Sequence, residues 1–62
     1  MTEATTIKFK DQESGDEAIA IVRYDDSSVG LSLSLASNGD VEVFMPKPIA
    51  RALIKELAKA AE

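Results

Sequence analysis

The sequence predicts one small α+β domain over residues 1–62, a four-stranded antiparallel meander (β-β-β-β-α) with one C-terminal amphipathic helix packed across one sheet face. Three observations predict this fold. Residues 29–44 hold two segments that alternate apolar and polar side chains around Asn38-Gly39, which is typical of a β-hairpin. Two earlier segments have the composition of strands. After Pro48 the apolar spacing changes from two residues to about 3.6 residues, which indicates a helix.

The N-terminal part supplies the first two strands. Residues 1–4 are expected to form a frayed tail, and residues 5–10 alternate with Ile7 and Phe9 on one face. A polar connection then leads to the second strand at residues 17–24, which is apolar on both of its faces. The turn that follows it is rich in aspartate and serine, whose short side chains bond to nearby backbone groups.

Turn geometry predicts which faces the strands share. The turn is either a four-residue loop at residues 25–28 or a two-residue loop at residues 26–27, and both loops pair Tyr24 with Val29. In the next hairpin a plain two-residue turn would pair Leu35 with Glu42 and place a carboxylate among leucines.

A three-residue loop at residues 37–39, with a bulge at Gly39, avoids that conflict and pairs Leu35 with Val41. The predicted core therefore lies on the leucine side of the sheet. It consists of Val22, Val29, Leu31, Leu33, Leu35, Val41, Val43 and Met45, covered by Ile49, Leu53, Ile54 and Leu57 of the helix.

The other face of the predicted sheet combines apolar and small residues. Ile19, Ile21 and Phe44 lie there around the small residues Ser32 and Ser34. No second helix is available to cover this face. We interpret it as a surface for a homodimer or for docking of another protein, and the alternative is a set of ordinary exposed apolar residues.

Size and composition also favour association. A chain of 62 residues buries only about 60% of the surface that its unfolded form exposes. The absence of cysteine and histidine removes disulfides and the common zinc ligands, so a partner subunit is the remaining way to add stability. The net charge of −4 argues against nucleic acid or a membrane surface as the main partner.

Few residues of the chain are suited to catalysis or to metal binding. Six serines lack a histidine or cysteine to activate or replace them, so we expect no catalytic residue and no enzyme. The acidic segment at residues 11–17 departs from the calcium-loop pattern, because its glycine is fifth and its twelfth position is Val22. No metal and no cofactor are therefore expected.

The helix has one ordered charge feature. Its cations recur every four residues and cluster on one face, and they are Lys47, Arg51, Lys55 and Lys59. A solvated helix face explains them. The alternative is a nucleic-acid-associated regulator that uses this basic face, although no aromatic platform accompanies it.

The sequence as a whole predicts a non-enzymatic protein-interaction module, a homodimer formed through the sheet face opposite the helix. A small-ligand or catalytic protein with a shared dimer groove is a third possibility. The N-terminus lacks the features of a signal peptide, and the longest uncharged stretch, residues 27–39, is too short to cross a membrane. A cytoplasmic location is expected.

Overall fold

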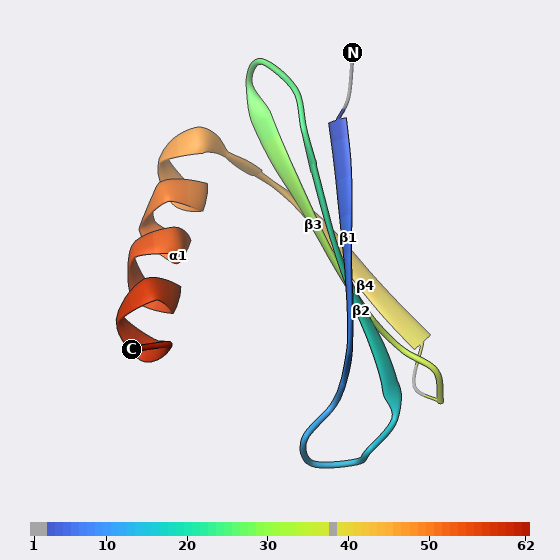
Figure 1. The fold of residues 1–62 in the computed structure, drawn as a ribbon. Coiled ribbons are helices and arrows are strands. Elements are labelled where there is room, and N and C mark those ends of the chain that lie inside the picture. Colours follow the sequence, from blue (N-terminus) through green and yellow to red (C-terminus); the bar gives the residue numbers. More distant parts are fainter. Residues whose placement is uncertain (1–2, 38) are drawn as a thin grey trace.

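The computed structural model describes residues 3–37 and 39–62, so the start of the expected tail and Asn38 of the expected turn lie outside the described residues. The chain forms β1 (Glu3–Lys10), β2 (Glu17–Tyr24), β3 (Ser28–Leu35), β4 (Gly39–Pro46) and α1 (Lys47–Ala60). The strands make one antiparallel sheet in the order β1-β2-β3-β4, and α1 follows β4 (Figure 1). The predicted α+β meander with one C-terminal helix is confirmed, and β1 begins two residues earlier than expected.

The strand register divides the sheet into two chemically different faces. The leucine face, as we call it, comprises Glu3, Thr5, Ile7, Phe9, Ala18, Ala20, Val22, Tyr24, Val29, Leu31, Leu33, Leu35, Val41, Val43 and Met45. The serine face comprises Thr6, Lys8, Lys10, Glu17, Ile19, Ile21, Arg23, Gly30, Ser32, Ser34, Asp40, Glu42 and Phe44. The predicted assignment of side chains to faces is confirmed, because successive residues of a strand point to opposite sides.

The predicted pairing within the last hairpin is wrong by two residues. Leu35 pairs with Gly39 and Leu33 with Val41, whereas the sequence predicted Leu35 beside Val41. The loop comes one residue earlier than expected, and Gly39, with a φ of 78°, is the first residue of β4. A shift of two residues keeps every side chain on its face, so hydrophobic patterning alone could not distinguish the two registers.

Aspartate side chains hold the two other turns. In the β2–β3 turn, Asp25 Oδ1 accepts bonds of 2.9 Å from the backbone N–H groups of Ser27 and Ser28. In the β1–β2 connection, Asp11 Oδ2 accepts from the N–H and hydroxyl of Ser14, at 2.9 and 2.7 Å. These bonds favour the carboxylate form. The Ser14 hydroxyl lowers the pKa of Asp11, and the two backbone N–H groups lower the pKa of Asp25, from an ordinary value of 3.8.

These turns should make stability depend on pH in the acid range. Since folding lowers both pKa values, the turn bonds stabilise the fold above the unfolded value of 3.8, and this contribution disappears as the pH falls through the folded values. Asp25→Ala should therefore be less stable than the wild type at neutral pH, and the gap should narrow at acid pH. Urea denaturation at several pH values measures the gap. Asp26→Ala is the matched control, because the turn bonds of Ser27 and Ser28 go to Asp25, and it should cost less stability than Asp25→Ala at neutral pH.

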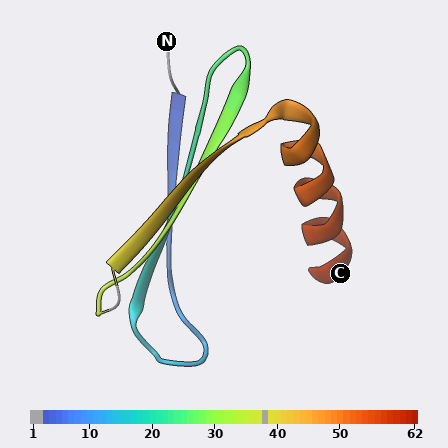
Figure 2. The ribbon, with the colours of Figure 1, turned by 180° about the vertical axis from the view of Figure 1, so that it is seen from behind.

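The expected core beneath the helix is not closed, which corrects the sequence prediction. Among the described residues, Ala18 and Ala50 are the only buried hydrophobic side chains. Helix α1 packs on the sheet near its N-terminus, where it contacts β3 and β4 and where Lys47 Nζ lies 5.7 Å from the centre of the Tyr24 ring. Farther along α1, Ile54 and Leu57 remain 64% and 58% exposed. Figures 1 and 2 show α1 leaving the end of β4 and standing off the sheet.

The direct junction of β4 and α1 explains why the helix does not close over the sheet. Pro46 ends the strand in an extended conformation, with φ −70° and ψ 158°, and α1 begins at the next residue. Pro48 then lies in the first helical turn, where proline is compatible with the helix. Since no loop residue separates the two elements, the extended backbone at Pro46 determines the direction in which α1 leaves the sheet.

The dimensions of the chain agree with this open arrangement. Its radius of gyration is 12.7 Å, whereas a compact chain of this length has about 10.6 Å. Its accessible surface is 4997 Å², against about 3,900 Å² for a compact monomer of 6.6 kDa. The isolated chain therefore exposes about 1,100 Å² more than its mass requires.

Candidate interaction surface

Two apolar walls form the most distinctive surface of the chain. The first wall is the leucine face, on which Ile7, Phe9, Leu33, Val41 and Val43 are all exposed. The second wall is the apolar arc of α1, which we define as Ile49, Ala50, Leu53, Ile54, Leu57, Ala60 and Ala61. Both walls belong to the helix side of the sheet, because Lys47 at the start of α1 lies over Tyr24 of the leucine face.

A shallow depression marks the part of the leucine face that lies farthest from the start of α1. Its volume is about 390 Å³, and the apolar side chains that line it are Phe9, Ala18, Leu33, Leu35 and Val41, with Ile19 of the other face. Residues of all four strands contribute to it, close to the two hairpin ends, while Asp11 and Asp40 add carboxylates. Helix α1 contributes no residue to the lining of the depression, so the chain's own helix does not fill it.

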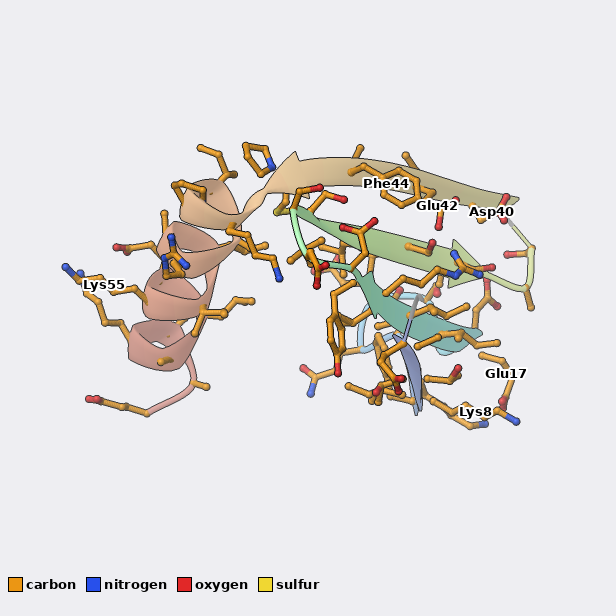
Figure 3. All side chains as sticks on the ribbon, turned by 90° about the horizontal axis from the view of Figure 1, so that it is seen from above. Lys8, Glu17, Asp40, Glu42, Phe44 and Lys55 are labelled. Atoms are coloured by element: carbon orange, nitrogen blue, oxygen red, sulfur yellow. The ribbon has the colours of Figure 1, made fainter. Side chains whose placement is uncertain are left out.

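The serine face is more polar than the leucine face. Glu42 forms an ion pair with Arg23 and accepts a 2.8 Å bond from the Ser32 hydroxyl, so three adjacent strands are linked across this face. Lys10 and Glu17 form a second ion pair at 3.7 Å. Figure 3 shows Asp40, Glu42 and Phe44 along β4, with Lys8 and Glu17 toward the opposite edge of the sheet, on β1 and β2.

The predicted interaction residues all lie on the serine face. Ile19, Ile21, Ser32 and Ser34 are half-buried there, and Phe44 is 64% exposed. The Phe44 ring covers Gly30 so closely that a Cβ at Gly30 would lie 2.6 Å from a ring carbon. The register brings these residues together, as expected, but Phe44 is the only strongly exposed large apolar side chain that the structure describes on this face.

Three of the basic residues of α1, Arg51, Lys55 and Lys59, lie on the arc opposite its apolar residues. Lys47 contacts the Tyr24 ring, and Lys59 forms an ion pair with Glu56 at 3.6 Å. Lys55 points away from the sheet in Figure 3. Two of the four cations thus have an interaction within the chain, and the use of this arc for nucleic acid stays a prediction.

Sequence reasoning assigned the exposed apolar residues of the helix side to a closed core, and so missed them as a surface. One signal could have identified them. Four strands make a sheet roughly 19 Å wide, whereas one helix covers about 10 Å. The leucine face is therefore about twice as wide as the helix that was expected to cover it.

No other kind of site stands out. Among residues 3–37 and 39–62, no group of three or more acidic, histidine or cysteine side chains is arranged to hold a metal ion. In the same described ranges, no helix has the length and apolar character needed to cross a bilayer. No family model, curated protein or solved structure matches this chain.

Proposed function

We propose that this protein is a non-enzymatic interaction module that works as a homodimer, and that the leucine face and the apolar arc of α1 form the dimer interface. The observation that supports this proposal is the excess exposed surface of about 1,100 Å². A typical specific interface buries about 800 Å² on each partner, so association of two copies accounts for an excess of this size.

The distribution of exposed apolar side chains favours the helix side over the serine face. Val41, Ile54 and Leu57 are each more than half exposed, and all lie on the helix side. An interface on the serine face would instead remove the Arg23–Glu42 ion pair from water. The desolvation penalty of a buried ion pair can exceed its Coulombic gain, so we expect the serine face to stay solvated.

Sedimentation equilibrium tests the proposal. We expect the wild type at micromolar concentration to have twice the chain mass of 6.6 kDa. Ile21→Asp, on the serine face, should leave this mass unchanged, because Ile21 lies outside the proposed interface.

Other outcomes would correct the proposal in defined ways. A wild type with the mass of a single chain would contradict the homodimer. A dimer that Ile21→Asp dissociates would move the interface to the serine face, with Ile19, Ile21 and Phe44. A complex of this chain with a second, different protein, in place of the dimer, would make the chain a heteromeric module.

A further inference from the structure

We infer that two copies exchange their helices, so that α1 of each copy lies across the leucine face of the other and its Leu57 enters the partner's depression. This inference rests on the proposed homodimer and adds the occupant of the surface. Its first support is geometric. The depression lined by Phe9, Leu33 and Val41 receives no residue of the chain's own α1. Because α1 begins directly after the last residue of β4, no loop is present through which this helix could turn back over the depression.

The apolar arc of α1 has the dimensions and chemistry of the missing cover. The helix has 14 residues and is therefore about 21 Å long, close to the length of an eight-residue strand, about 26 Å. Ile54 and Leu57 on this arc are largely exposed in the single chain. The leucine face of a second copy is an apolar surface that this arc can cover without any other protein. The short junction at Pro46 is the kind of hinge that favours exchange of helices between copies over packing of a helix on its own sheet.

Charge favours a helix-to-sheet contact over a sheet-to-sheet contact between two copies. Residues 1–45 hold nine acidic and three basic side chains, a net charge of −6, whereas residues 46–62 hold four basic and two acidic ones, a net charge of +2. A helix from a second copy is therefore attracted to the sheet that it covers. Two sheets facing each other directly would instead repel, since each is strongly acidic.

Reciprocal exchange is a closed arrangement. Each copy donates one helix and accepts one, so a two-fold axis relates the two contacts and both are made within one dimer. The basic arc with Arg51, Lys55 and Lys59 would face outward on both helices, in agreement with the direction of Lys55 in Figure 3.

Cysteine crosslinking tests the exchange, and the chain has no cysteine of its own to interfere. Leu33→Cys and Leu57→Cys are made in separate chains with different tags, mixed under conditions that allow subunit exchange, and treated with a short bismaleimide. We expect the mixed crosslink to exceed either self-crosslink about tenfold, because the two thiols of one complex react at a high effective concentration. Lys55→Cys, two residues from Leu57 but on the basic arc, is the matched control and should give no mixed crosslink with Leu33→Cys.

Other arrangements of the helix and the sheet would give different crosslinked products. A chain that carries both Leu33→Cys and Leu57→Cys and crosslinks internally, at the mass of one chain, would show that α1 closes over its own sheet and would overturn the exchange. A dominant self-crosslink of Leu33→Cys would indicate that two leucine faces meet directly. If the wild type sediments as a dimer without the mixed crosslink, only the exchange is wrong, whereas a monomeric wild type removes the proposed function itself.

Discussion

A hundredfold dilution of the protein should lower its midpoint of thermal unfolding by about 10 °C. For a dimer that unfolds to two separate chains, each tenfold dilution removes about 1.4 kcal/mol of stability, so a hundredfold dilution removes about 2.7 kcal/mol. With the unfolding entropy typical of two chains of 62 residues, that loss corresponds to the stated shift. Circular dichroism melts at about 100 μM and about 1 μM measure it.

The size of this effect follows from the burial pattern. Among the described residues, Ala18 and Ala50 are the only buried hydrophobic side chains, so the single chain has almost no core of its own, and the proposed dimer would supply most of the stability. The melts of a stable monomer would coincide at the two concentrations. Coincident midpoints, together with a single-chain mass, would contradict the dimer.

Replacing Ile54 with aspartate should dissociate the protein. In the single chain Ile54 is 64% exposed, so the same change in a monomer would alter stability by no more than about 0.5 kcal/mol. At a dimer interface each copy loses about 1.5–3 kcal/mol of apolar burial and must desolvate a carboxylate, and the dimer contains the substitution twice. The dissociation constant should rise by about a hundredfold or more, as measured by sedimentation equilibrium.

Ala52→Asp provides the matched control for this experiment. Ala52 lies in the same helix, is exposed, lies outside the apolar arc, and its replacement changes the charge by the same amount. This variant should remain dimeric. If Ile54→Asp and Ala52→Asp behave alike, the apolar arc of α1 does not lie at the interface.

Local sequence signals were sufficient for the strands, the helix and the assignment of side chains to faces. The leucine–serine alternation around Leu33 fixed which residues share a face, because the strand period is exact. It did not fix the pairing of Leu33 with Val41, since a slip of two residues preserves both faces. The positive φ of Gly39 was predictable from the residue type, but its place as the first residue of β4 was not.

The prediction for the candidate site was less complete, for a reason visible in particular residues. Ile19, Ile21 and Phe44 were selected because no helix remained to cover them, on the assumption that α1 closes the leucine face. That second face instead has contacts among its own residues, namely the Arg23–Glu42 ion pair and the Phe44 ring over Gly30. The exposed positions are the ones assigned to the core, including Val41 and Leu57.

The sequence by itself determined that this chain forms a four-stranded meander and an amphipathic helix, and that no disulfide can stabilise its 62 residues. Periodicity and turn residues act over a few positions, so they are readable from the chain alone. Only the tertiary structure decided where α1 lies. That position depends on the backbone angles at Pro46 and on the absence of a loop before Lys47, which together leave the apolar arc and the leucine face available to a second copy.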